Sequence, residues 1–112
     1  MSAPIVYFEL AGPDVQRLAA FYAQVFGWQS RPGPFPNYLS LGGEVGTERG
    51  AGFRQETAPE RVLYARVPDL QQTLDQVVAG GGKVLIPPTE VPGVVHFALF
   101  EDPGGNRMGI VQ

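Results

Sequence analysis

The chain has 112 residues, a formal net charge of −3 and 44% hydrophobic residues, which suits one domain with one hydrophobic core. Its eight Lys and Arg residues are scattered, so we expect no nucleic-acid partner, and no run is long and apolar enough for a membrane span. It has no cysteine, which excludes disulfides and thiolate-ligated metals, and its first residues do not resemble a signal peptide, so we expect a cytoplasmic protein.

The first half of the chain is predicted to form a strand, a helix and three short strands. Residues 5–10 are a β-branched and aromatic run typical of a strand. Apolar residues recur at helical spacing over 15–26, after Pro13-Asp14 as a start signal and before Gly27 as a stop signal. Turn signals, among them Pro32-Gly33-Pro34, separate the segments that follow. The three short strands are expected at 28–30, 37–41 and 51–54.

The second half repeats this order. A strand is expected at 61–67 and a helix from Leu70 to Val78, ended by Gly80-Gly81-Gly82. Pro87-Pro88 and residues 102–105 indicate turns between the segments that follow. The three strands of this half are expected at 83–86, 94–100 and 107–111.

A short internal repeat supports the division into halves. Pro13-Asp14-Val15-Gln16 returns as Pro68-Asp69-Leu70-Gln71, 55 residues later. We therefore predict one α+β domain over residues 1–112, built from two tandem βαβββ modules at about 1–57 and 58–112. The modules should share a curved mixed sheet, with the helices outside and a cup inside. A ferredoxin-like α+β fold is the alternative, and it ranks second because three strands follow each helix.

Two motifs carry a family resemblance that covers nearly the whole chain. Residues 21–28, FYAQVFGW, follow the first strand, and residues 102–106, DPGGN, precede the last one. Together they resemble the glyoxalase/bleomycin-resistance/dioxygenase superfamily, also called vicinal oxygen chelate. The resemblance implies paired βαβββ modules that form a cup, in a protein that is usually a homodimer.

In metal-dependent members, the resemblance implies four His, Gln or Glu ligands inside the cup, two from each half. Matched to the motifs of this chain, those positions fall on Tyr7, Gly52, Val62 and Gly109. Glycine offers no side-chain donor and valine is apolar, so none of the four suits a divalent ion. We therefore expect no metal and no other cofactor.

Strand alternation identifies candidate ligand-binding residues in the cup. Val6, Phe8 and Leu10 form the more apolar face of the first strand and should meet the helix, which leaves the other face for the cup. The lone histidine could act there as a general base or a hydrogen-bond donor. The candidates are Tyr7, Glu9, Tyr64, Arg66 and His96.

A structural interpretation of these residues stays open. Glu9 and Arg66 could form an ion pair that bridges the halves, and Tyr7 and Tyr64 could simply fill volume. His96 could equally be a packed or rim residue.

Three functions remain at this stage. The first is a metal-free, homodimeric protein that binds a small organic molecule. The second is an enzyme of the lyase, isomerase or dioxygenase class, acting on a small carbonyl or vicinal-oxygen substrate. The third is a structural or regulatory role through protein contacts, which a cup filled by its own side chains would favour.

Overall fold

The computed structural model describes residues 2–42 and 50–112, and its ten elements follow the predicted order. The helices are α1 (Val15–Phe26) and α2 (Leu70–Ala79). The strands are β1 (Ile5–Gly12), β2 (Ser30–Pro32), β3 (Tyr38–Gly42), β4 (Gly50–Gln55), β5 (Glu60–Arg66), β6 (Lys83–Val91), β7 (Val95–Glu101) and β8 (Arg107–Val111). No helix in these ranges is long and apolar enough to cross a membrane.

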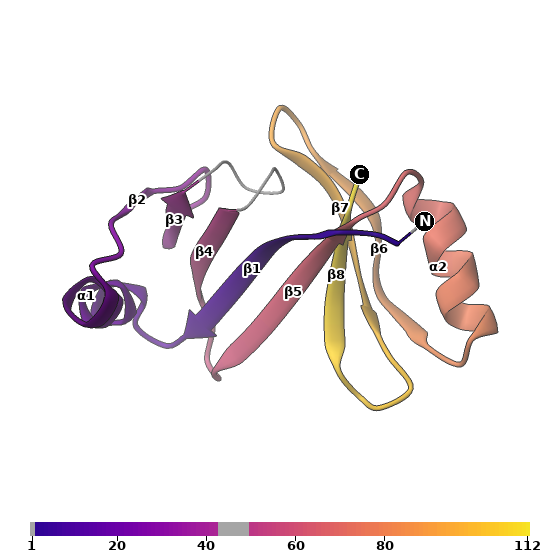
Figure 1. Ribbon diagram of the computed structural model, residues 1–112, viewed down its shortest axis with the longest axis horizontal. Coiled ribbons are helices and arrows are strands. Elements are labelled where there is room, and N and C mark those ends of the chain that lie inside the picture. Colours follow the sequence, from indigo (N-terminus) through magenta and orange to yellow (C-terminus); the bar gives the residue numbers. More distant parts are fainter. Residues whose placement is uncertain (1, 43–49) are drawn as a thin grey trace.

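All strands belong to one open, curved sheet in the order β2-β3-β4-β1-β5-β8-β7-β6. The first strand of each half runs parallel to the last strand of the same half, β1 to β4 and β5 to β8. The halves join where β1 pairs antiparallel with β5 (Figure 1). The predicted fold of two βαβββ modules in a mixed sheet is therefore confirmed, and the ferredoxin-like alternative is wrong.

The repeated tetrapeptide marks the two helix starts. The carboxylate of Asp14 accepts a hydrogen bond from the backbone N–H of Arg17 at 3.1 Å. Asp69 does the same for Gln72 at 3.0 Å. Each aspartate satisfies a backbone donor that has no partner inside its helix, which is why this residue type recurs at the N-cap. Gly27 ends α1 with a positive φ of 72° that suits glycine.

Prolines that predict turns lie in strands at both edges of the sheet. β2 ends with Pro32, and β6 continues through Pro87 and Pro88 to Val91. An edge strand leaves one row of its N–H groups unpaired, so proline is tolerated there. The pairing of β6 with β7 also shifts between Ile86 and Thr89, around the two prolines.

Two buried clusters hold the helices on the outside of the sheet. In β4, Ala51 and Phe53 pack with Val15 and Ala19 of α1, so the alternate residues of β4 face the cup. Leu70 and Leu74 of α2 pack with Ala98 and Ile110 in the same way. A third cluster lines the inner face of the sheet.

Val6 packs with the inner cluster, although the alternation of the strand places it beside the helix. The pairing of β1 with β5 is irregular between Ile5 and Tyr7, which changes the face that Val6 meets. The rest of β1 follows the prediction, because Phe8 and Leu10 pack on the α1 side.

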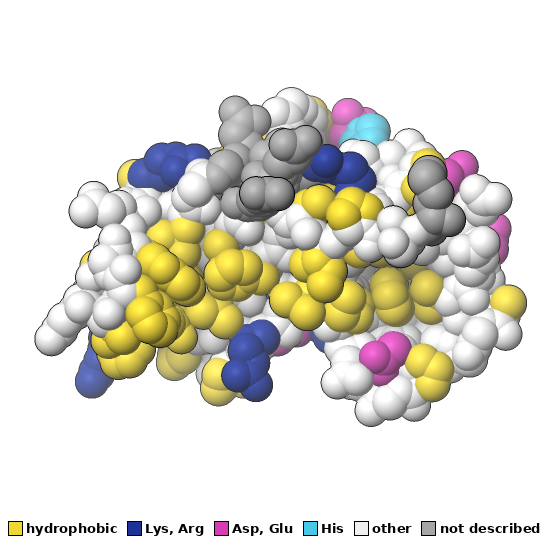
Figure 2. Space-filling view, in the orientation of Figure 1, with side chains coloured by type: hydrophobic (Ala, Val, Ile, Leu, Met, Phe, Trp, Pro, Cys, Tyr) yellow, Lys and Arg dark blue, Asp and Glu magenta, His cyan; other side chains and the backbone are white. Residues whose placement is uncertain are grey.

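The two helices lie at opposite ends of the molecule and differ in their outer faces (Figure 1). Phe21 and Phe26 of α1 are 55% and 59% exposed, and Val25 between them is 52% exposed. Hydrophobic side chains gather at this end of the molecule in the view of Figure 2. On α2, Val78 is the one large hydrophobic residue with comparable exposure among the described residues.

Candidate functional site

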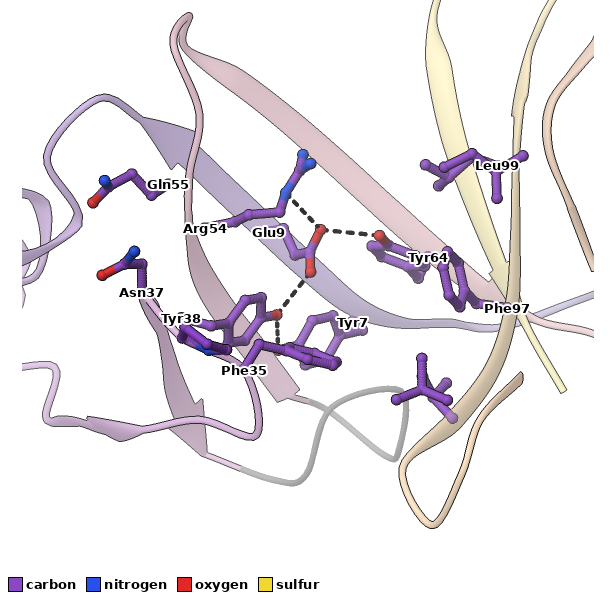
Figure 3. Close-up of a pocket in the computed structure, with 14 residues that line it drawn as sticks. Tyr7, Glu9, Phe35, Asn37, Tyr38, Arg54, Gln55, Tyr64, Phe97 and Leu99 are labelled. Carbon is purple, nitrogen blue, oxygen red and sulfur yellow. Dashed lines mark hydrogen bonds and ion pairs between the residues drawn. The ribbon is translucent and has the colours of Figure 1, made fainter. Parts of the chain in front are cut away.

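The concave face of the sheet holds a cavity of about 450 Å³ with two unlike walls (Figure 3). The first half of the chain supplies the polar wall, and the second half supplies a wall that is apolar except for one phenol. The lining residues of the first half are Tyr7, Glu9, Phe35, Pro36, Asn37, Tyr38, Arg54 and Gln55; those of the second half are Tyr64, Ile86, Val91, Val95, Phe97 and Leu99.

A buried carboxylate lies at the centre of the polar wall. Glu9 is only 6% exposed. Its Oε2 accepts a hydrogen bond from the Tyr38 hydroxyl at 2.7 Å, and its Oε1 accepts one from the Tyr64 hydroxyl at 2.9 Å (Figure 3). A carboxylate removed from water is costly unless both oxygens find donors, and the two phenols from different halves meet that need.

The hydrogen bonds of this cluster have a fixed direction. The hydroxyl oxygens of Tyr7 and Tyr38 are 2.6 Å apart. A phenol carries one proton, and that of Tyr38 already points to Glu9. Tyr7 must therefore donate to Tyr38, which gives a chain from Tyr7 through Tyr38 to Glu9.

All three phenols of the cluster are protonated at neutral pH, and burial raises their pKa values further above that range. Loss of solvation raises the pKa of Tyr7 to about 12. Burial also raises the pKa of Tyr38 and of Tyr64 above the ordinary value, and the negative charge of Glu9 acts in the same direction. A phenolate beside this carboxylate is unfavourable because two like charges would share a water-poor site.

Arg54 is the one cation among the residues that line the cavity, and carboxylates surround it. Its Nε lies 3.5 Å from Oε1 of Glu9, its Nη1 lies 2.9 Å from Glu56, and its Nη2 lies 2.8 Å from Glu60. Burial lowers the pKa of Arg54, but Glu9 and Glu60 outweigh this effect and raise the pKa above its usual value. The Nε is buried and has no hydrogen-bond partner, the one such side-chain atom in the described ranges.

The metal site that the family resemblance implies does not fit the residues present. A Cβ on Gly52 would collide with the Tyr38 hydroxyl and lie 2.6 Å from the Tyr7 hydroxyl. A Cβ on Gly109 would collide with the ring of Tyr64. Tyrosine side chains thus occupy the space that side chains from these two positions would need. No group of three His, Asp or Glu residues that could hold a metal occurs within residues 2–42 and 50–112.

Three of the five predicted cup residues come together in the structure. Tyr7, Glu9 and Tyr64 all line the cavity and belong to one hydrogen-bonded cluster. Their role in ligand binding stays a prediction.

The other two predicted cup residues lie outside the cavity lining. His96 is flanked on β7 by Val95 and Phe97, which line the cavity, so alternation turns it to the opposite face. There its Nε2 lies 3.4 Å from Glu90. Arg66 is the last residue of β5, two positions beyond Tyr64, and Arg54 takes the place beside Glu9 that the sequence suggested for it.

Sequence reasoning missed Tyr38 and Arg54, although the alternation of their strands identifies both. Leu39 and Leu41 pack toward α1, which turns Tyr38 inward on β3. The inward assignment of Gly52 likewise implies an inward Arg54, two residues along β4.

Comparisons with known proteins agree with this fold. The model of the glyoxalase-like domain family matches residues 7–111. A glyoxylase-like domain-containing protein of Didymella fabae is 30% identical over 112 residues, covering 91% of this chain and 88% of that protein. The anthracycline biosynthesis protein DnrV of Streptomyces peucetius is 30% identical over 123 residues, covering 93% of this chain and 45% of DnrV. This chain therefore spans less than half of DnrV.

A solved structure extends the comparison to three dimensions. The Mn(II)-bound glyoxalase of Novosphingobium aromaticivorans has a TM-score of 0.72 at 22% identity, over 97% of this chain and 38% of that chain. At this identity the likeness shows the fold alone.

Proposed function

This chain belongs to the glyoxalase-like domain family, and we propose that within this family it binds a small organic molecule in its cup without a metal ion. The observation that carries the proposal is the contrast between the two walls of one cavity. An apolar wall gives affinity for a ring system, and a few fixed polar groups opposite orient it, which is the usual composition of a small-molecule site.

The size of the cavity supports a ligand of drug-like dimensions. A volume of about 450 Å³ lies within the range of roughly 300–1,000 Å³ typical of ligand pockets. Phe97 and Val95 of β7 present apolar surface to it. DnrV is named for anthracycline biosynthesis, and a polycyclic ring system of that kind suits such a wall.

Binding ranks above the enzymatic alternative because the candidate acid–base groups are hydrogen-bonded to one another or lie outside the cavity. The raised pKa of each cavity phenol means that none of them is a phenolate base at neutral pH. The side chain of His96 lies outside the cavity and is half exposed. A general base must lie within hydrogen-bond reach of the proton it removes. Glu9 is the one carboxylate among the residues that line the cavity, and both of its oxygens already accept hydrogen bonds from phenols.

A pair of phenylalanines on β7 tests the proposal. Phe97 lines the cavity, and Phe100 is also half-buried but packs on the α2 side. We expect Phe97→Ala to weaken binding of the neutral fluorescent probe N-phenyl-1-naphthylamine about tenfold or more, because it removes aromatic surface from the apolar wall. Phe100→Ala should lower the melting temperature and leave the dissociation constant of the probe nearly unchanged.

Titration of probe fluorescence measures both constants. Equal affinities for the parent and Phe97→Ala, or equal losses in the two variants, would show that the probe does not use the cup. No saturable binding to the parent protein would reject the proposal itself.

A further inference from the structure

We infer from the direction of the hydrogen bonds that the cup selects uncharged or cationic molecules in which an apolar ring system carries a hydroxyl or amino donor, and that it rejects anions. This inference rests on the proposed function and names the ligand class of the same cavity. It follows from where the protons of the polar wall already point.

The hydroxyl protons of Tyr7, Tyr38 and Tyr64 are all donated in hydrogen bonds within the cluster. Tyr38 and Tyr64 donate to Glu9, and Tyr7 donates to Tyr38. A phenol oxygen that has given its one proton can only accept from a further partner. Tyr7 and Tyr64, although they are hydroxyl residues, therefore act toward a ligand as acceptors.

The carboxylate adds further acceptor capacity at the same place. An ionised carboxylate has about four lone-pair positions and no proton to give, and the two phenols fill two of them in Glu9. The amides of Asn37 and Gln55 could donate to a ligand, but both residues are exposed at the rim. The buried acceptors of the cup, Tyr7, Tyr64 and Glu9, thus favour a ligand that carries its own hydrogen-bond donor.

The charges around Glu9 and Arg54 disfavour an anionic ligand. Each nitrogen of the Arg54 guanidinium faces a carboxylate, from Glu9, Glu56 and Glu60 in turn. Glu60 also meets Arg107 at 3.0 Å. Arg54, the cation that lines the cavity, is therefore already compensated, and a carboxylate or phosphate in the cup would meet the charge of the buried Glu9 carboxylate.

The opposite wall sets how the rest of the ligand lies. Val95, Phe97 and Leu99 of β7 line the cavity, and Ile86 of β6 adds to them. Figure 3 shows Phe97 and Leu99 on this wall. A flat apolar body packs against this surface while its donor group points to Tyr7 and Glu9. The donor and the ring must therefore occupy opposite ends of the bound molecule.

Three naphthalene probes separate the parts of this inference. At neutral pH, 2-naphthol offers a donor, 2-methoxynaphthalene has the same ring with the donor blocked, and 2-naphthoate is an anion. We expect the parent protein to bind 2-naphthol at least about tenfold more tightly than 2-methoxynaphthalene, and 2-naphthoate most weakly, by isothermal titration. Equal affinities for the first two probes, or tight binding of 2-naphthoate, would overturn the inference.

The variant Glu9→Gln should change this preference. The carboxamide oxygen is favoured at the Oε1 position, because the Tyr64 hydroxyl and Nε of Arg54 both approach it there. The NH2 group then points to Tyr38 and donates to it, which frees the Tyr38 proton for Tyr7 and the Tyr7 proton for a ligand. We expect Glu9→Gln to lose the preference for 2-naphthol and to bind 2-methoxynaphthalene more tightly than the parent does.

Glu60→Gln is the matched control for that variant. It makes the same chemical change at a carboxylate that contacts Arg54 but does not line the cavity. Its preference for 2-naphthol over 2-methoxynaphthalene should match that of the parent. An unchanged preference in Glu9→Gln, or the same shift in both variants, would contradict the hydrogen-bond chain from Tyr7 through Tyr38 to Glu9.

The probe series also distinguishes the two proposals. If N-phenyl-1-naphthylamine binds the cup and the naphthalene probes show no preference or no binding, the ligand class is wrong and the binding function stands. If no probe binds the parent, both proposals fail. If Glu9→Gln does not fold, the order of the three probes on the parent protein still decides the inference.

Discussion

The two halves of the chain share one backbone plan but place different chemistry in the cup. At the repeat spacing of 55 residues, Glu9 of β1 corresponds to Tyr64 of β5, the same residue that donates to it. Tyr38 pairs with Arg54 across β3 and β4, whereas the corresponding strands β7 and β8 pair Phe97 with Val111. The first half therefore contributes an acid, a phenol and a guanidinium where the second contributes one phenol and two apolar groups.

The residues that are identical at corresponding positions of the two halves maintain the backbone rather than line the cavity. Asp14 and Asp69 both cap helices, and Gly52 and Gly109 both leave room for a tyrosine. These backbone positions are thus the same in both halves, whereas the compared positions that face the cavity differ. An internal repeat is good evidence for a fold and poor evidence for the chemistry of its interior.

The largest expected loss of stability comes from adding a side chain at Gly52, the glycine behind the polar wall. Gly52→Ala places a methyl group against the hydroxyls of Tyr38 and Tyr7 and should push both out of their chain. We expect it to lower the free energy of unfolding by about 3 kcal/mol, as overpacking of a tight core does, measured by urea denaturation.

Gly12→Ala is the control for this change, because Gly12 is the last residue of β1 and has nothing within 4 Å of an added Cβ. It should change the free energy of unfolding by less than about 0.5 kcal/mol. A Gly52→Ala protein as stable as Gly12→Ala would mean that the phenols do not fill the space behind the polar wall.

An intermediate loss of stability is expected on removing either phenol hydroxyl that donates to Glu9, one from each half of the chain. Tyr38→Phe removes the hydrogen-bond donor of Glu9 Oε2 and the acceptor of the Tyr7 hydroxyl. Tyr64→Phe removes the donor of Glu9 Oε1, but Nε of Arg54 still lies 3.5 Å from that oxygen. We expect losses of about 2 kcal/mol for Tyr38→Phe and about 1 kcal/mol for Tyr64→Phe in urea denaturation. A larger loss for Tyr64→Phe would place the stronger partner of Glu9 in the second half.

The last effect is a pH dependence of stability that develops only in alkali. The pKa of Tyr7 is raised from 10.0 to about 12, so folding favours its neutral form. The stability that this provides is fully present below pH 10 and is lost as the pH rises through about 12. The free energy of unfolding should therefore fall over this range, and it should fall less steeply in Tyr7→Phe. Parallel curves for the two proteins would contradict the burial of this hydroxyl.

Periodicity was sufficient to predict the fold because most of the signals are local. Helix caps, apolar spacing and turn residues act within a few positions of each other, and the tetrapeptide at 13–16 and 68–71 linked the two halves. The errors fall at the sheet edges, where Pro87 and Pro88 continue a strand. Whether a strand lies at an edge depends on the order of the whole sheet, which no local window contains.

The site was predictable only as far as alternation was applied to each strand. It identified Tyr7, Glu9 and Tyr64 correctly as residues that face the cup. It could not choose between Arg66 and Arg54 as the neighbour of Glu9, because that depends on β4 lying beside β1, a contact between segments more than 40 residues apart. For His96 the same rule predicts the outer face once Phe97 is known to be inward.

The bond between Glu9 and Tyr64 joins two positions that an ancestral duplication would have made identical. A chain made from two copies of the first half would bring two carboxylates together at this point, and like charges in a dry site repel. A chain made from two copies of the second half would bring two phenols together and place no acid at this point. This pocket could therefore arise only after the copies had diverged, and neither half could build it as a symmetric pair.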